Sequence, residues 1–233
     1  MSDEGAVVVV GGTRGIGLEI ARHFAETGHK VVVTGQTPAN VDAAVAALEG
    51  HVTGLAFDLA RPETIAPSLA DVGPVRHLVV VAIDRDDNTI KDYDIGRAAR
   101  LTVLKLVGYA EVVHTLLDRL DDTSSIVLFG GQAKDLPYPG STTVSSVNGG
   151  VEGLTRSLVH QLKPIRVNCI HPGIVGDSPY WKDRQAALEA TRARTPIGRT
   201  VTMAEIVSAT VFLLENTAMN GVYLKVDGGI HAT

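Results

Sequence analysis

The chain has 233 residues, of which 45% are apolar, and a formal net charge of −5. This length suits one domain with one large core. No apolar run approaches the roughly 20 residues of a membrane span, and no long basic run indicates a nucleic-acid partner, so neither class is expected. Cys169 is the only cysteine, which excludes a disulfide within the chain and predicts a reducing, cytoplasmic location.

Short β-branched runs alternate with longer helical patterns along the chain. Near-continuous apolar runs are typical of strands that are buried on both faces of a parallel sheet. Strands alternating with helices also predict right-handed crossovers, and hence a doubly wound α/β fold. The seven predicted strands are Ala6–Val10, Lys30–Thr34, Val52–Phe57, Leu78–Ala82, Ser125–Phe129, Ile165–Ile170 and Val222–Val226.

The helical patterns have recognisable ends. The first carries Ile16 and Phe24 on one side and stops at Gly28, a favourable residue after a helix. Asn40 is expected to cap the second helix, and Pro62 to begin the third. The six predicted helices are Gly15–Thr27, Val41–Leu48, Glu63–Leu69, Tyr93–Leu120, Thr143–Leu162 and Ala204–Leu214.

One stretch, from Gly173 to about Thr195, fits neither pattern and contains Tyr180 and Trp181. It follows a strand, and ligands of open α/β sheets bind beyond the carboxyl ends of the strands. We therefore expect a substrate lid over about residues 174–200. The chain shows no internal repeat or linker, so residues 1–233 are predicted to form a single domain.

A glycine-rich loop follows the first predicted strand and opens the first helix: Gly11-Gly12-Thr13-Arg14-Gly15-Ile16-Gly17. Gly11 allows a sharp turn, Gly15 lets a phosphate approach the backbone, and Gly17 lets the helix pack closely on the sheet. The free N–H groups of the helix N-terminus can bind a pyrophosphate. The loop therefore predicts a dinucleotide site, although a tight turn without a ligand can have the same pattern.

These features resemble the short-chain dehydrogenase/reductase family along the whole chain. Val10 replaces the Thr that begins the family's glycine motif, but the three glycines are kept. Motifs in matching order over more than 200 residues imply the family's Rossmann-type fold, without fixing the function. They include Asp58, Gly149-Gly150-Val151-Glu152-Gly153-Leu154-Thr155, Arg166-Val167-Asn168, His171-Pro172-Gly173, Pro196-Ile197-Gly198-Arg199 and Val226-Asp227-Gly228-Gly229.

The charge around the predicted dinucleotide site favours NADP(H). A site for the unphosphorylated ribose usually has a carboxylate after the second strand, but residues 33–37 contain no acid. Arg14 could contact a 2′-phosphate, the alternative being a solvated cation. Asp58 could bind the adenine edge or cap a turn. The cofactor-binding residues implied by the resemblance are Gly11, Thr13, Arg14, Gly15, Ile16, Gly17, Gln36, Asp58, Leu59, Ala82, Asn148, Pro172, Gly173 and Val175.

The resemblance also implies four catalytic positions, and all four are changed here. The family uses a Tyr for proton transfer, a Lys four residues later, a Ser that polarises the carbonyl and an Asn that anchors a water relay. Aligned through residues 149–154, these positions fall on Val144, Asn148, Gly131 and Lys105, respectively. No tyrosine in the chain is followed four residues later by a lysine. No catalytic residue of the family type is therefore predicted, and the rate of conventional ketone reduction is expected to be strongly reduced.

The predicted nicotinamide half of the site is also altered. The family's Asn-Asn-Ala-Gly segment corresponds to Val80-Val81-Ala82-Ile83, and Ile83 is expected to crowd the adenosine ribose and weaken binding. The Thr that binds the nicotinamide amide in the family is replaced near Gly176-Asp177. The phosphate-binding half is therefore predicted to be kept and the nicotinamide half to be lost.

Four functions fit this sequence. The first is a non-catalytic NADP(H)-binding protein, either a cofactor sensor or a partner subunit. The second is a biosynthetic enzyme with reassigned chemistry, such as a cyclase, isomerase or dehydratase, that uses a buried Lys105 of lowered pKa; a surface position would exclude that role. The third is a reductase that positions its small-molecule substrate through Tyr180 or Asp177. The fourth is a structural subunit that binds no nucleotide.

The sequence also predicts an oligomeric state and the absence of a metal site. The helices at Tyr93–Leu120 and Thr143–Leu162 resemble the pair at the family's dimer interface, and the last strand resembles its second interface. We therefore expect a homodimer or homotetramer. No group of histidine, cysteine or carboxylate residues has convincing zinc spacing, so no metal is predicted.

Overall fold

The computed structural model describes residues 5–232 and contains one seven-stranded sheet in the order β3-β2-β1-β4-β5-β6-β7. Every neighbouring pair of strands is parallel. The predicted α/β, Rossmann-type sheet is therefore confirmed. The strands are β1 (Ala6–Val10), β2 (Val31–Gly35), β3 (Val52–Ala56), β4 (Val75–Val80), β5 (Leu120–Phe129), β6 (Arg166–Pro172) and β7 (Tyr223–Val226).

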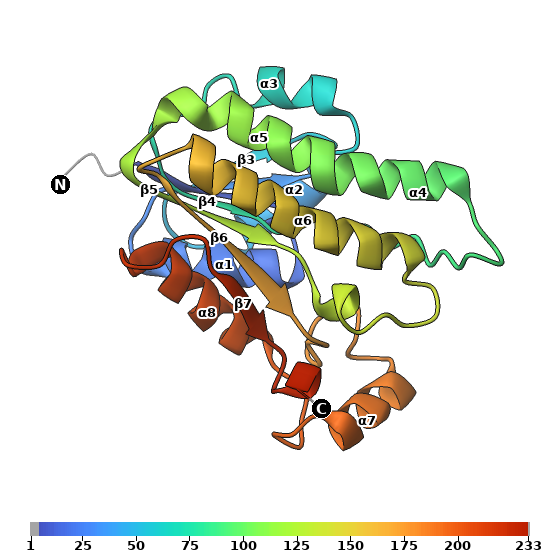
Figure 1. Ribbon diagram of the computed structural model, residues 1–233. Helices are drawn as coiled ribbons and strands as arrows, with labels where there is room; N and C mark the ends of the chain where they lie inside the picture. Colours follow the sequence, from blue (N-terminus) through green and yellow to red (C-terminus); the bar gives the residue numbers. More distant parts are fainter. Residues whose placement is uncertain (1–4, 233) are drawn as a thin grey trace.

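Helices cover both faces of the sheet (Figure 1). One face carries α1 (Gly15–Glu26), α2 (Pro38–Ala46) and α8 (Met203–Glu215). The other carries α3 (Ile65–Ser68), α4 (Ile95–Thr102), α5 (Tyr109–Leu116) and α6 (Thr142–Gln161). Within residues 5–232, no helix is both long enough and apolar enough to cross a membrane.

The two helical layers enclose two separate cores because successive strand side chains point to opposite faces. Val8 and Val10 of β1 belong to the core beneath α3, α5 and α6. Val7 and Val9 belong to the core beneath α1 and α8. All four side chains are almost completely buried. This burial on both faces explains why the strands appear in the sequence as uninterrupted apolar runs.

The last crossover differs from the predicted right-handed pattern. The connections β4 to β5 and β5 to β6 pass over the face of α5 and α6, whereas β6 to β7 continues in the same direction with α8 on the opposite face. This connection therefore has the opposite hand. It spans residues 173–222 and includes the lid, and it is one of the few parallel crossovers that depart from the right-handed rule.

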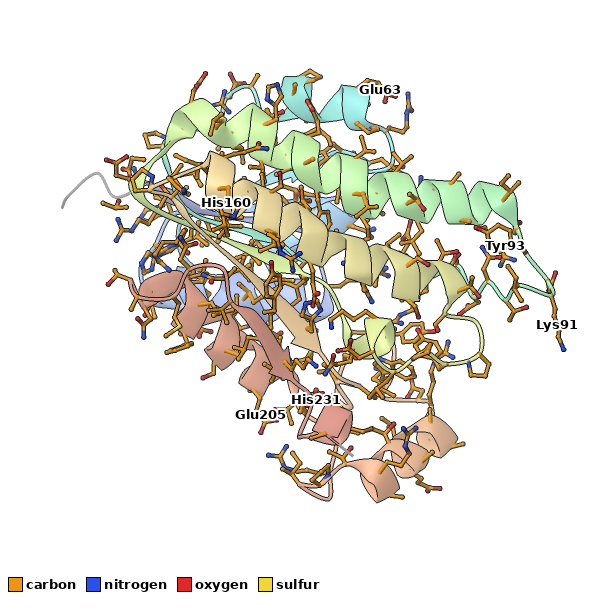
Figure 2. All side chains as sticks on the ribbon, in the orientation of Figure 1. Glu63, Lys91, Tyr93, His160, Glu205 and His231 are labelled. Carbon is orange, nitrogen blue, oxygen red and sulfur yellow. The ribbon has the colours of Figure 1, made fainter. Side chains whose placement is uncertain are left out.

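Three local expectations were wrong in detail. Asn40 does not cap α2; Thr37 does, because its Oγ1 accepts a hydrogen bond from the Asn40 N–H at 3.3 Å. The long helix begins after its cap, Asp94, with Tyr93 in the preceding loop (Figure 2). The predicted lid is not entirely irregular, because it contains α7 (Gln185–Arg194), which lies beyond the carboxyl ends of β6 and β7.

The long helix is interrupted by a π-helical segment, Val103–Gly108, between α4 and α5. The wider turn changes which side chains face the sheet, and such segments are frequent at functional sites. Lys105 lies in this segment and is 1% exposed. The interruption therefore places a lysine in the interior, where the charged form requires compensation.

Helix α8 starts with a reciprocal cap. The Oγ1 of Thr202 accepts from the Glu205 N–H at 3.3 Å, and a Glu205 carboxylate oxygen accepts from the Thr202 N–H at 2.9 Å. We expect Thr202→Ala to lower the free energy of unfolding by about 1 kcal/mol in urea titrations. Ser208→Ala, on the exposed face of α8, is the matched control. Equal stability of the two variants would contradict this assignment.

Candidate functional site

Two adjoining cavities lie at the carboxyl ends of the strands. The first, of about 600 Å³, lies over the glycine loop at residues 11–17. The second, of about 620 Å³, lies between Gly131, Val144 and the lid residue Trp181. Ile83 and Arg85 line both cavities. The first cavity lies where the strand order reverses beside β1, the usual ligand position in this type of sheet.

The glycine loop brings three backbone segments closer together than side chains would allow. Gly11 has φ +90°, and a Cβ there would lie 2.7 Å from the backbone nitrogen of Ala82. Gly15 has φ +55°, which L residues rarely adopt. A Cβ on Gly17 would collide with the carbonyl oxygen of Gly11. The residues fit a pyrophosphate, because this cradle leaves the N-terminal N–H groups of α1 open toward the first cavity.

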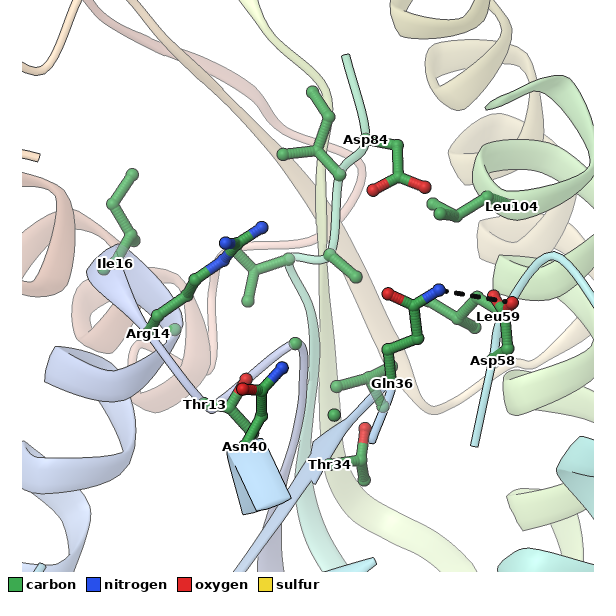
Figure 3. A pocket seen from close by; sticks show the side chains of 18 of the residues that line it. Thr13, Arg14, Ile16, Thr34, Gln36, Asn40, Asp58, Leu59, Asp84 and Leu104 are labelled. Carbon is green, nitrogen blue, oxygen red and sulfur yellow. Dashed lines mark hydrogen bonds between the residues drawn. The ribbon is translucent and has the colours of Figure 1, made fainter. Parts of the chain in front are cut away.

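Figure 3 shows the polar side chains of the first cavity, with Arg14 extending from the glycine loop and Gln36 from the end of β2. Gln36 donates from Nε2 to the Asp58 carboxylate at 3.4 Å. Asp58 is held more firmly by Arg100, whose guanidinium donates to both carboxylate oxygens at 2.9 and 3.1 Å. Burial opposes ionisation of Asp58, but the hydrogen bonds from Arg100 and Ala60 hold its pKa below the usual value.

Every sequence-predicted cofactor residue lines one of these cavities. Ten of the fourteen line the first cavity: Gly11, Thr13, Arg14, Gly15, Ile16, Gly17, Gln36, Asp58, Leu59 and Ala82. The others line the second cavity, which Ile16 also borders: Asn148, Pro172, Gly173 and Val175. Their proximity agrees with one shared ligand, and their role in binding it stays a prediction.

The four aligned catalytic positions also lie together, because Lys105, Gly131, Val144 and Asn148 all line the second cavity. Val144 is 2% exposed and packs with Leu101 and Val147. A Cβ on Gly131 would lie 2.8 Å from Nδ2 of Asn148. A hydrocarbon side chain, a glycine and an amide therefore form the wall where the resemblance places the family's two hydroxyl groups and its lysine.

Lys105 is buried and satisfied by neighbouring oxygens. Its Nζ donates to the carbonyl oxygen of Phe129 and, at 2.9 Å, to Oη of Tyr109. The Tyr109 hydroxyl in turn donates to the carbonyl oxygen of Ala82 at 2.7 Å. Burial, reinforced by the charge of Arg85, lowers the pKa of Lys105 to about 7. The surface-cation alternative for Lys105 is therefore wrong.

His171 is a structural residue of β6. Its Nδ1 accepts from the Gly131 N–H at 3.1 Å, and its Nε2 lies 3.2 Å from a Glu152 carboxylate oxygen and 3.3 Å from Sγ of Cys169. Burial and the charge of Lys134 lower the pKa of His171 to about 4, so the ring is neutral at physiological pH. Among residues 5–232, no group of histidine, cysteine and carboxylate side chains could hold a metal ion.

The lid contributes Tyr180 to both cavities and Trp181 to the second. The guanidinium of Arg85 lies over the Tyr180 ring, 4.0 Å from its centroid, and donates to the Tyr138 hydroxyl at 3.0 Å. Asp177 instead accepts from the Met203 N–H at the start of α8, at 2.9 Å. Tyr180 is therefore a candidate substrate contact, whereas Asp177 caps a helix.

The fold and motif order agree with comparisons to known proteins. The family model described as enoyl-(acyl carrier protein) reductase matches residues 10–231. The chain belongs to the short-chain dehydrogenase/reductase family. This family has an NAD(P)-binding fold.

Relatives match over nearly the whole chain. The short-chain dehydrogenase/reductase malC of Malbranchea aurantiaca is 27% identical over 96% of this chain and 93% of its own. A solved structure described as MalC reductase/Diels-Alderase superposes with a TM-score of 0.91, covering 99% of this chain and 97% of that one at 25% identity. The 3-oxoacyl-[acyl-carrier-protein] reductase of Bos taurus is 29% identical over 97% of both chains.

Two arginines of the site were missed by the sequence analysis. Arg100 lies in the long helix and Arg85 in the loop after β4, 42 and 53 residues from their partners Asp58 and Tyr138. No local spacing connects such pairs. The only available signal was that Arg85 closely follows a predicted strand, where the ligands of parallel sheets gather.

The lowered pKa of Lys105 makes stability depend on pH. Between about pH 7 and its ordinary value of 10.5, the unfolded chain binds more protons than the folded one, so stability rises with pH. We expect the free energy of unfolding of the wild type, minus that of Lys105→Met, to increase by on the order of 1 kcal/mol per pH unit from pH 8 to 10. The measurement is urea denaturation at each pH.

The matched control is Lys182→Met, at an exposed lysine of the lid. Its stability difference from the wild type is expected to stay nearly constant over the same pH range. A constant difference for Lys105→Met as well would mean that Lys105 stays charged in the folded protein.

Proposed function

We propose that this protein binds NADP(H) in the first cavity but lacks the conventional ketone reductase activity of its family, serving as a cofactor sensor, a partner subunit or a repurposed biosynthetic protein. The observation that carries this proposal is the wall of the second cavity. Val144 and Gly131 occupy the positions aligned with the proton donor and the carbonyl-polarising hydroxyl, and both line this cavity. Neither residue can donate a proton from its side chain.

NADP(H) is favoured over NAD(H) by the charges of the first cavity. Arg14 is exposed at the N-terminus of α1, close to where a ribose 2′-phosphate would extend from a pyrophosphate held by the loop. The end of β2 presents the neutral Gln36, not a carboxylate that would repel this phosphate. Asp58 is neutralised by Arg100. A 2′-phosphate at Arg14 would therefore meet a cation, while Asp58 and Asp84, the carboxylates that line this cavity, are both paired with Arg100.

NADPH supplies a hydride when bound, and carbonyl reduction also needs a proton at the carbonyl oxygen. Losing a general acid typically costs about 10²–10⁴ in rate. Asn148 can still hydrogen-bond a ribose but carries no charge that would lower the pKa of a neighbouring group. The residues of this chain therefore favour holding the dinucleotide over completing the reduction.

A second candidate is an enzyme with reassigned chemistry, either a reductase that uses non-standard residues or a non-redox cyclase or isomerase. Lys105 favours it, because its pKa of about 7 makes both protonation states available near neutral pH. The relative described as a reductase/Diels-Alderase is a precedent for ring formation on this fold. In this case Lys105→Met would abolish turnover without weakening NADPH binding.

Cofactor binding is tested by titrating NADPH and NADH into the purified protein and following the fluorescence of the single tryptophan, Trp181. We expect NADPH to bind more tightly than NADH, and Arg14→Gln to reduce this preference by about tenfold through loss of a charge-assisted contact. The control is Arg61→Gln, an exposed arginine outside the cavity. No binding of either nucleotide would indicate a structural subunit.

Loss of the proton donor is tested by restoring it. We expect the wild type to show no NADPH-dependent reduction of ethyl acetoacetate, and Gly131→Ser/Val144→Tyr/Asn148→Lys to gain it. Asn148 must change together with Gly131, since a side chain at position 131 would crowd the Asn148 amide. The matched control is Gly131→Ser/Val144→Phe/Asn148→Lys, which lacks only the Tyr hydroxyl. Its reduction rate should be at least about 10²-fold below that of the variant with Tyr. Wild-type turnover at ordinary enzyme rates would refute the proposal.

A further inference from the structure

Three guanidinium groups from separate parts of the chain line the second cavity. Arg85 comes from the loop after β4, Arg184 from the lid and Arg194 from the end of α7. Arg85 is half-buried, whereas Arg184 and Arg194 are exposed, so they lie nearer the rim. Within residues 5–232, no carboxylate oxygen lies within 4.0 Å of any of the three. This contrasts with Arg100, whose charge is neutralised by Asp58 and Asp84.

Two of the three carboxylates that line this cavity have partners within the protein. Asp135 lies 2.6 Å from Nζ of Lys134 and 3.0 Å from Nζ of Lys225. Asp227 lies 2.7 Å from Nδ1 of His231 and also accepts from the amide of Gln132. Asp87 lines the cavity without an ion pair in the described part of the chain, but it is exposed. The three arginines therefore outnumber the available carboxylates.

Aromatic rings hold two of these guanidinium groups in place. Arg85 lies 4.0 Å from the centroid of Tyr180, and Arg184 lies 4.2 Å from the same centroid. Arg85 also lies 5.3 Å from the centroid of Trp181. These cation–π contacts hold the guanidinium groups beside the rings, and a planar guanidinium carries five N–H donors that can bind an acceptor. Among residues 5–232, Arg85 uses one donor, at the Tyr138 hydroxyl.

The body of the cavity beyond these charges is largely apolar. Leu136, Val144 and Ile174 line it, and Ile83 separates it from the first cavity. A volume of about 620 Å³ is within the range of small-molecule sites. A simple inorganic anion would leave this apolar surface uncovered. A carboxylate attached to a ring or chain would satisfy both the charged rim and the apolar interior.

We propose that the second cavity binds an organic carboxylate, whose anionic group is held by Arg85 and Arg184, with Arg194 adding charge at the rim, and whose apolar body packs against Val144 and Ile174. This inference extends the proposed function, on which it rests, by naming the class of small molecule bound beside NADP(H). The ligand is recognised through its charge, not through a carbonyl group polarised for reduction.

The test compares two probes of the same shape and different charge, 2-naphthoate and 2-naphthamide. Both are titrated into the purified protein by isothermal calorimetry at low ionic strength. We expect the carboxylate to bind about tenfold more tightly or better, the preference that charge-assisted hydrogen bonds typically give. Equal affinity of the two probes, or binding of neither at millimolar concentration, would overturn the proposal.

Variants of the arginines show which of them cause the preference for 2-naphthoate over 2-naphthamide. Arg85→Gln/Arg184→Gln should bring the two affinities to within about threefold, whereas Arg192→Gln, on α7 but outside the cavity, should retain the full preference. Loss of Arg85 could disturb the lid, so a second double variant, Arg184→Gln/Arg194→Gln, changes only exposed side chains. It should reduce the preference for 2-naphthoate over 2-naphthamide by half or more. A full preference in both double variants would overturn the proposal.

NADPH titration of the same preparations distinguishes this inference from the proposed function. Arg14→Gln should weaken NADPH binding and leave the preference for 2-naphthoate unchanged. Loss of NADPH binding with an intact naphthoate preference would refute the proposed function alone. Intact NADPH binding with no naphthoate preference would refute the carboxylate site alone.

Discussion

The close approach of the glycine loop to the ends of β1 and β4 is the constraint on which the site depends. Gly11 packs against the Ala82 backbone, and Gly17 against the carbonyl oxygen of Gly11. Any side chain at these positions would push α1 away from the sheet edge. Because α1 begins there, its N-terminal N–H groups open into the cleft between the two halves of the sheet. This packing forms the floor of the first cavity, and the ion pairs of Arg100 with Asp58 and Asp84 lie in its wall.

The second cavity is built on a different physical basis. Gly131 and Val144, whose side chains carry no hydroxyl group, line it, and several of the charged groups around it have partners within the protein. Lys105 is held by the Phe129 carbonyl and Tyr109, Asp135 is paired with Lys134, and Asp227 lies 2.7 Å from Nδ1 of His231. Arg85 connects the loop after β4 to the lid through Tyr180. An apolar interior under a cationic rim suits binding of an amphipathic anion better than proton delivery to a ketone.

Lys105 connects the helical layer to the carboxyl edge of the sheet. A buried ammonium is costly unless its protons are accepted, and the π-helical segment allows Nζ to reach oxygens at the ends of β4 and β5 through Tyr109 and Phe129. The same burial lowers its pKa to about 7. This residue is thus a structural bridge between the helical layer and the sheet, in the wall of the second cavity.

The sequence by itself determined the seven strands, the order of the helices outside the lid and the glycine loop, because each depends on local periodicity or on residue types that a turn requires. The family motifs supplied the register for Val144, Gly131, Asn148 and Lys105, and these four residues line one cavity. Only the tertiary structure decided that Lys105 is buried, that Asp58 is paired with Arg100, and that Arg85 stacks on Tyr180. These contacts join residues tens of positions apart, and the crossovers, the π-helical turn and the lid, not any local pattern, bring them together.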